Sequence, residues 1–245
     1  LYFNAIVEKD NGLANFQLAQ VFAHAPDKRF SCHQYYQKRI PIEQILKFAK
    51  TNEQKGNIYL LAGIDKPDKA LPYLQSYYQC DPGAEGLAFL LLREMNKIED
   101  YVLTPYYTLF QPSISYGFST QDISVKQTLL RSESDRAYAR EVLKFLNKSN
   151  EKKVFNPYFY NSCKAYLLFL TRDYNACISL STQLEKTAKD SLLQNQLGKI
   201  KALALTANQK KGPVVIPSDI QTDILNNRSN GQIGRAHVWT PVTLE

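Results

Sequence analysis

Methionine, tryptophan and histidine are almost missing from this 245-residue sequence, which holds one Met, one Trp and three His. Gly and Pro are also scarce, with 10 and 11 copies, which excludes collagen-like and loop-dominated chains. No apolar run reaches the roughly 18–20 residues that a membrane-spanning helix needs. Hydrophobic residues nevertheless make up 44% of the chain and charged residues 22%. This composition predicts one or two folded units with a core and argues against global disorder.

The residue types that most often carry catalysis or metal binding form no recognisable motif. His24 and His33 lack supporting ligands at a defined spacing, such as the H-E-x-x-H pattern. The four cysteines lie far apart and include no C-x-x-C pair, so neither a zinc site nor a thioredoxin-like site is expected. Glycine-rich phosphate loops, dinucleotide fingerprints and nucleophile elbows are absent too. We therefore expect no catalytic residue, no metal and no cofactor, and we expect that the chain is not an enzyme.

Two of the cysteines, Cys163 and Cys177, stand at apolar positions on predicted helices that flank a single turn. Buried packing of two small side chains is the expected role. A disulfide bridge between them stays an alternative that the sequence does not indicate. The even number of cysteines leaves disulfides, and with them the redox compartment, undetermined.

Apolar residues recur at helical spacing through most of the chain, and no segment shows sustained strand alternation. The clearest pair of helices covers 54–64 and 69–79, joined by a D-K-P-D turn, and 84–102 predicts a long, strongly apolar helix. Further helices are predicted at 11–23, 41–49, 132–146, 156–170, 174–187, 191–206 and 218–225. The expected class is all-α, with antiparallel helix hairpins.

One stretch, 104–131, interrupts this pattern with two prolines, a glycine and several serines and threonines. We expect an irregular, aromatic connection there, with helices resuming at Ser132, where the sequence S-E-S-D offers a capping signal. The predicted organisation is therefore a sequence of five segments. These are an N-terminal helical segment (1–103), the irregular connection (104–131), a C-terminal helical segment (132–208), a short tail helix (209–231) and a tail (232–245).

The two ends of the chain suggest a fragment. The sequence begins at Leu1 without a start residue, and its single methionine is the internal Met95. Residues 232–243, Q-I-G-R-A-H-V-W-T-P-V-T, resemble the translation of a common sequencing adapter, with Trp239 where that adapter carries a stop. We expect this run to be non-native read-through, and we exclude it from fold reasoning. Leaving out the whole tail, 232–245, removes Arg235 and Glu245, and the formal net charge stays at +7.

The helix pairs resemble tetratricopeptide repeats, whose unit is an antiparallel pair of helices of ~34 residues. In 58–82 the second helix carries Ala70, Leu74 and a closing Pro82 at the spacing of that family, although the turn is longer. In 165–187 an acidic-aromatic turn, Asp173-Tyr174, precedes Cys177 and Leu184, but Ser181 replaces the expected aromatic and no proline follows. The resemblance covers about half of the chain and implies a solenoid of hairpins.

A second resemblance lies in residues 89–105, F-L-L-L-R-E-M-N-K-I-E-D-Y-V-L-T-P, which look like a stretch in large uncharacterised helical proteins of Bacteroidota. That family implies a bacterial origin without a settled activity. The resemblance leaves the cell envelope open as a location and says nothing about mechanism.

Glu94 is the one charged residue that falls on an apolar helical face, between Leu91 and Ile98, whereas the helical phase points Lys97 elsewhere. A buried carboxylate must be paired, hydrogen-bonded or protonated, because burying it bare costs several kcal/mol. We expect Glu94 to tie neighbouring helices together through an Arg or a Tyr. A general acid would need a second carboxylate across a cleft, which the sequence does not identify.

The net charge of +7 and the pI of about 9.1 raise the question of nucleic acid. Lys and Arg are scattered among acidic residues and do not form one stripe, so solvated faces explain them better. A helical repeat that reads RNA bases with a few side chains per unit stays open as an alternative.

Tyrosine and phenylalanine are plentiful, with 16 and 12 copies, and several occur in adjacent pairs. A solenoid buries a continuous core and exposes a groove, where tyrosines are good anchors because they bring a large area with few rotatable bonds. We therefore predict a non-catalytic scaffold that binds a protein or peptide. The alternatives are a nucleic-acid-binding repeat and the helical accessory domain of an enzyme. The residues expected to bind are Tyr77, Tyr78, Tyr106, Tyr107 and Phe110.

Overall fold

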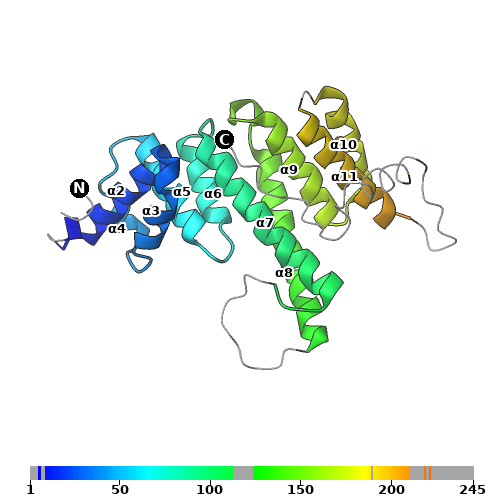
Figure 1. Cartoon of the computed structure of the whole chain (residues 1–245), viewed down its shortest axis with the longest axis horizontal. Coiled ribbons are helices and arrows are strands. Elements are labelled where there is room, and N and C mark those ends of the chain that lie inside the picture. Colours follow the sequence, from blue (N-terminus) through cyan, green and yellow to red (C-terminus); the bar gives the residue numbers. More distant parts are fainter. Residues whose placement is uncertain are drawn as a thin grey trace. The chain divides into compact units, whose positions relative to one another are not determined.

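The computed structural model describes residues 5–6, 9–112, 124–188, 190–209, 218 and 221. Within these residues the chain forms ten α-helices and two short 3-10 helices and contains no strand, so the all-α prediction is confirmed (Figure 1). The chain divides into two compact units, the first made of 1–135 and 148–157 and the second of 136–147 and 158–245. Helix α8 contributes its first half to one unit and its second half to the other.

The first unit contains six complete helices and the first half of α8. The structure confirms the predicted hairpin of α5 and α6, and α7 packs against both of these helices (Figure 1). Helix α2 packs against α3, α4 and α5. The complete helices are α2 (Asn11–His24), α3 (Arg29–Tyr35), α4 (Ile42–Leu46), α5 (Asn52–Asp65), α6 (Leu71–Cys80) and α7 (Glu85–Thr108).

Two glycines allow α5, α6 and α7 to approach one another around a single tyrosine. The ring of Tyr77 on α6 is 2% exposed and fills the space beside Gly56 on α5 and Gly86 on α7. A Cβ atom built on Gly56 would lie 2.7 Å from this ring, and one on Gly86 would lie 2.3 Å from its hydroxyl oxygen. The prediction that Tyr77 is a binding anchor is therefore wrong: the space that these glycines leave makes it a core residue.

The boundaries predicted around 104–131 are wrong at both ends. Helix α7 continues through Pro105 and ends at Thr108, although proline usually breaks a helix interior by removing one hydrogen bond. Contacts from other segments hold this turn of the helix, since the Ser132 hydroxyl donates to the carbonyl oxygen of Val102 at 2.9 Å. Helix α8 (Val125–Lys148) begins seven residues before Ser132. Residues 113–123 of the predicted connection lie outside the described residues.

The start of α8 is a capping box that the sequence prediction missed. The Gln127 amide donates to the Ser124 hydroxyl at 3.3 Å, and the Ser124 amide donates to Gln127 Oε1 at 3.0 Å. This reciprocal pair satisfies backbone donors that a helix start would otherwise leave without partners. The S-E-S-D sequence at Ser132 has similar chemistry but lies inside the helix, because Ser132 is buried against α7.

The second unit contains the second half of α8 with α9 (Pro157–Leu170), α10 (Tyr174–Thr187) and α11 (Ser191–Ala207). Asp173 and Asp190 cap α10 and α11 by accepting from the Ala176 amide at 3.4 Å and the Leu192 amide at 2.8 Å. Ala165, Leu184 and Leu197 form a core cluster that joins the three helices.

Cys163 and Cys177 are buried and unbridged in this unit, as their predicted packing role requires. Burial raises the pKa of Cys163 well above its usual range and that of Cys177 to about 11. The predicted tail helix and the adapter-like run fall almost entirely outside the described residues.

Candidate functional site

The middle of α7 carries an unusual set of buried polar contacts. Glu94 is fully buried, as its helical phase predicted. Its Oε1 accepts from the backbone amide of Ala70 at 3.0 Å, and its Oε2 lies 2.5 Å from Lys97 Nζ. The carboxylate therefore connects α7 to Ala70, the residue directly before α6, and it pairs with a lysine of its own helix. The sequence analysis had named an Arg or a Tyr as its partner.

Lys97 is also fully buried, which corrects the prediction that it points away from this face. Its ammonium nitrogen lies 2.6 Å from the carbonyl oxygen of Asp68 and 3.3 Å from that of Lys66, besides the Glu94 carboxylate. An ammonium group has three donors, and here it meets three oxygen atoms. Desolvation lowers the pKa of Lys97, while the adjacent Glu94 charge opposes that shift.

Two further side chains of α7 bind the same turn between α5 and α6. Arg93 Nε donates to the carbonyl oxygen of Ile64 at 2.8 Å, and the Tyr101 hydroxyl donates to that of Pro67 at 2.9 Å. We call Arg93, Glu94, Lys97 and Tyr101 the buried polar cluster. It satisfies backbone groups in the last turn of α5 and in the 66–70 connection, and so it fixes α7 on the α5–α6 hairpin.

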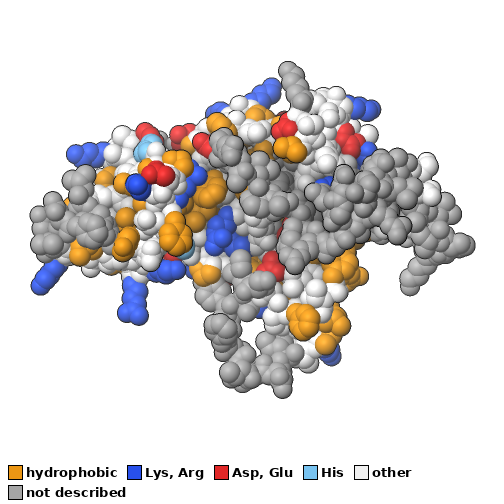
Figure 2. All heavy atoms as spheres, viewed as in Figure 1, with side chains coloured by type: hydrophobic (Ala, Val, Ile, Leu, Met, Phe, Trp, Pro, Cys, Tyr) orange, Lys and Arg blue, Asp and Glu red, His pale blue; other side chains and the backbone are white. Residues whose placement is uncertain are grey.

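The end of α7 has the opposite character. Tyr106 is 52% exposed, Tyr107 67% and Phe110 74%, so three of the predicted binding residues lie together at the surface. The rings of Tyr106 and Tyr107 meet edge to face, with their centroids 5.3 Å apart. Leu109 is half exposed beside them, and Val125 and Leu130 at the start of α8 are exposed as well. Figure 2 shows hydrophobic side chains over these ends of α7 and α8.

We call Tyr106, Tyr107, Leu109, Phe110, Val125 and Leu130 the apolar tip. Polar contacts join the segment that follows α7 to α8. Gln111 Nε2 donates to the Thr128 hydroxyl at 2.6 Å, and Arg131 Nη1 donates to Gln111 Oε1 at 3.0 Å. These contacts tie the residues that follow α7 to the first turns of α8.

Leu109 adds backbone strain at this surface. Its φ of 62° is in the left-handed region, which glycine prefers at the C-terminal end of a helix and which is uncommon for a leucine. Such a residue costs on the order of 1 kcal/mol. The chain thus holds a strained, half-exposed leucine directly before a phenylalanine that is 74% exposed.

Tyr78, the remaining predicted binding residue, is half-buried and not part of the tip. Its hydroxyl oxygen accepts from the backbone amide of Asn150 at 2.7 Å, in the loop that follows α8. The structure therefore separates the predicted binding residues into a core residue, a loop contact and three exposed aromatics. The apolar pattern missed Leu109, Val125 and Leu130, because exposure of these side chains depends on where the neighbouring helices end.

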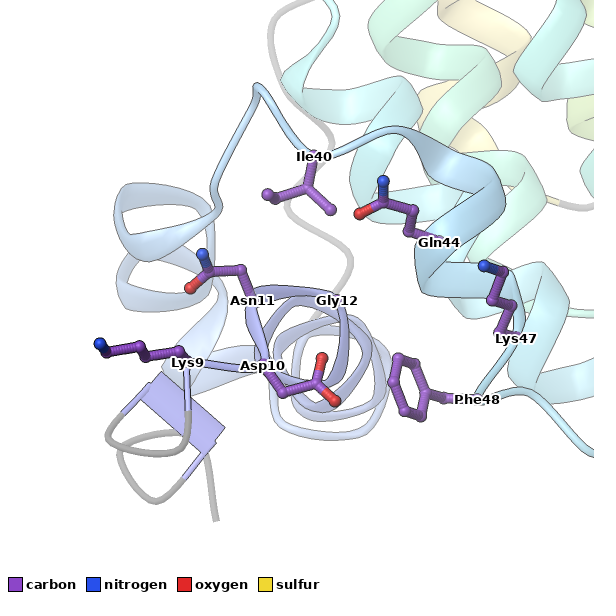
Figure 3. Close-up of a pocket in the computed structure, with 8 residues that line it drawn as sticks. All are labelled: Lys9, Asp10, Asn11, Gly12, Ile40, Gln44, Lys47 and Phe48. Atoms are coloured by element: carbon purple, nitrogen blue, oxygen red, sulfur yellow. The ribbon is translucent and has the colours of Figure 1, made fainter.

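A hollow of about 290 Å³ lies between the start of α2 and α4, lined by Lys9, Asp10, Asn11, Gly12, Ile40, Gln44, Lys47 and Phe48 (Figure 3). The ring of Phe48 lies beside Gly12, while Lys9 extends away from it. Asp10 already accepts from the Leu13 amide at 2.9 Å as the cap of α2. The charged side chains that line the hollow do not point to a common centre, so the hollow is a weaker candidate site than the apolar tip.

His24 and His33 each lie against a carboxylate, and the one beside His33 is buried. His33 Nε2 is 3.3 Å from Asp65 Oδ1, which Lys38 Nζ approaches to 2.9 Å, and His24 Nε2 is 3.4 Å from Glu53 Oε1. Across the described ranges, no group of three or more His, Cys, Asp or Glu side chains is placed to hold a metal ion. None of the helices in the same ranges combines the length and apolar character that a bilayer span requires.

Comparison with known proteins adds no relative. No family model matches the chain, and no curated protein or solved structure shows significant similarity to it.

Proposed function

We propose that this chain is a non-catalytic scaffold of helical repeats that binds a protein or peptide through the apolar tip. The observation that carries the proposal is the concentration of exposed apolar side chains at one place. Among the described residues, eleven large hydrophobic side chains are exposed, and six of them form the tip. Single exposed apolar residues are ordinary, whereas several at the ends of two consecutive helices are typical of an interaction surface.

The composition of the tip suits protein recognition. Tyrosine and phenylalanine bring large contact areas with few rotatable bonds, and they are over-represented among the residues that dominate binding energy. Tyr106 and Tyr107 also retain a hydroxyl group that can accept or donate once the ring is covered. A partner that offers apolar or aromatic side chains would bury these rings without any cofactor.

The helix-hairpin arrangement supports the repeat part of the proposal. Helices α5 and α6 pack as one pair and α10 and α11 as another. The second tetratricopeptide-like stretch, 165–187, lies on α9 and α10. Ala70 and Leu74, which carry the tetratricopeptide resemblance in the first pair, are fully buried, and Cys177 is fully buried on α10. These are the packing roles that such residues have in stacked hairpins.

Peptide selection tests the proposal directly. The full chain is immobilised and panned against a phage-displayed library of random peptides, and dissociation constants of enriched peptides are measured for the wild type and for Phe110→Ser. Phe30→Ser is the matched control, because Phe30 is 79% exposed but lies on α3. We expect apolar peptides to be enriched and Phe110→Ser to weaken them about tenfold or more, with Phe30→Ser unchanged.

The same measurement separates the proposal from nucleic-acid binding. Peptide binding through the tip should change little with salt, whereas binding to RNA or DNA should weaken steeply as salt rises. Failure to enrich any peptide, or equal weakening by Phe30→Ser and Phe110→Ser, would contradict the proposal. A salt-sensitive complex with single-stranded RNA would favour the alternative.

A further inference from the structure

Polar groups at the end of α7, beside the apolar tip, already have hydrogen-bond partners within the chain. The Thr108 hydroxyl donates to the Thr104 carbonyl at 2.6 Å, and the Leu109 amide donates to the Pro105 carbonyl at 3.1 Å. The Phe110 amide donates to the Thr108 hydroxyl at 3.2 Å. These groups are satisfied within the helix end itself. A partner would therefore be held by apolar area and not by hydrogen bonds to this backbone.

Charge around the tip is nearly balanced, in contrast to the net charge of +7 of the whole chain. The described residues of 100–112 and 124–135 include two basic side chains, Lys126 and Arg131, and three acidic ones, Asp100, Glu133 and Asp135. Arg131 Nε also lies 3.6 Å from Asp135 Oδ2, which keeps part of this charge internal. A strongly acidic or basic partner gains little here, and two copies of the tip can approach without electrostatic repulsion.

The exposed area is close to what a dimer needs. The three aromatic side chains, of about 150–250 Å² each, are between half and three-quarters exposed, and Leu109, Val125 and Leu130 are about half exposed. Together they offer on the order of 600 Å² of apolar surface, and a standard stable interface buries about 800 Å² on each partner. Backbone and neighbouring polar atoms at the rim supply the remainder.

We infer that the protein bound by the apolar tip is a second copy of this chain, in a symmetric dimer. A two-fold axis places the same patch on both sides of the contact, so the aromatic rings of one tip pack on those of the other. Such a contact needs apolar area and matched, neutral charge, which are the properties of this surface. The inference rests on the proposed function, since it names the partner of the same site.

Sedimentation velocity and light scattering of the full chain over a range of concentrations test this inference. We expect a monomer–dimer equilibrium with a dissociation constant of about 1–100 μM, as an interface of this modest size allows. The double variant Tyr107→Ser/Phe110→Ser should shift that constant at least tenfold towards monomer. The matched control Phe30→Ser should leave it unchanged. Circular dichroism shows whether each variant keeps its helical content.

Hydrogen exchange of the wild type gives a second readout that needs no substitution. Amides of residues 106–111 should become more protected as the concentration rises through the dimerisation range, while those of α3 should not. Self-association through the tip is overturned by a chain that stays monomeric at all concentrations, or by a dimer that survives the double substitution. It is also overturned by a monomer that co-sediments with phosphatidylcholine–phosphatidylserine vesicles only when the tip is intact.

Failure of this inference can be distinguished from failure of the proposed function. A monomeric chain whose tip still selects peptides overturns self-association alone. A monomeric chain that selects no peptide overturns both.

Discussion

Two regions of helix α7 break the usual rule of apolar inside and polar outside, in opposite directions. In its middle, a glutamate and a lysine are completely buried. At its end, two tyrosines, a leucine and a phenylalanine are at least half exposed. In the first region, buried side chains form hydrogen bonds that fix the turn of the α5–α6 hairpin. The second region leaves large apolar side chains exposed to water. The buried polar groups serve the fold here, and the exposed apolar groups form the surface that we propose for binding.

The difference has a physical basis in what each region must satisfy. Residues 66–70 join α5 to α6, and the carbonyl groups in the last turn of α5 lack partners within the helix, so these buried backbone groups need partners from elsewhere. Arg93, Glu94, Lys97 and Tyr101 supply those partners. At the tip the backbone is already satisfied, so its side chains are not needed for that purpose. Specific substitutions in each region should therefore have very different consequences.

The largest effect is expected when the buried ion pair is broken. Lys97→Met leaves the Glu94 carboxylate buried without its cation and should lower the free energy of unfolding by about 3–5 kcal/mol. Chemical denaturation followed by circular dichroism measures this change. The double variant Glu94→Leu/Lys97→Met removes both charges and should be more stable than Lys97→Met alone. A loss below about 1 kcal/mol for Lys97→Met would contradict the buried position of the pair.

Alkaline pH should destabilise the first unit through its buried phenols. Burial raises the pKa of Tyr36, Tyr77 and Tyr101 well above 10, the value expected in the unfolded chain. Above pH 10 the unfolded state loses these protons while the folded state keeps them. Stability therefore falls as pH rises, by at most about 1.4 kcal/mol per pH unit for each phenol. Lys97 acts in the opposite sense, because its pKa is lowered in the fold.

Denaturation series between pH 8 and pH 12 measure this dependence. Tyr101→Phe removes one of the three phenols and should flatten the fall above pH 10. Stability that is constant from pH 9 to pH 12, or the same slope in Tyr101→Phe, would contradict the buried, neutral state of these side chains.

Helix class and the burial of Glu94 could be predicted from the sequence, because both follow from the spacing of apolar residues along one helix. The burial of Lys97 could not be predicted, because its position along the helix falls on the polar face. Its burial is explained by the carbonyl oxygens of Lys66 and Asp68, which accept from its ammonium group. Tyr77 was predicted to lie on a binding surface because adjacent tyrosines are good anchors for a partner. The space that holds it comes from Gly56 and Gly86, which are distant in sequence.

The exposed aromatic residues could be predicted as a group, but the helix ends that carry them could not. The prolines and serines of 104–131 indicated an irregular connection, whereas tertiary contacts carry α7 past Pro105 to Thr108. The start of α8 did have a local signal, the S-V-K-Q capping box at Ser124, which competed with S-E-S-D at Ser132. Choosing between two such signals requires knowing that Ser132 is buried.

A smaller effect, and one of opposite sign, is expected at the strained residue of the tip. Leu109→Gly places at a left-handed position the residue that tolerates it best, and it should raise the free energy of unfolding by up to about 1 kcal/mol. Thermal denaturation of dilute protein measures the change. Leu109→Ala is the control, because alanine keeps the Cβ atom that causes the strain. A loss of stability in Leu109→Gly would show that the leucine side chain contributes to the fold.

The smallest effect on folding should come from the most exposed aromatic of the tip. Phe110→Ser, at a residue that is 74% exposed, should change the unfolding free energy of dilute protein by less than about 0.5 kcal/mol. Phe22→Ser, at a residue that is 2% exposed, should cost several times more. Dimerisation through the tip would stabilise the wild type by mass action, so the difference between wild type and Phe110→Ser should grow with protein concentration. A large cost of Phe110→Ser in dilute protein would make the tip part of the core, and the contrast between the two regions of α7 would disappear.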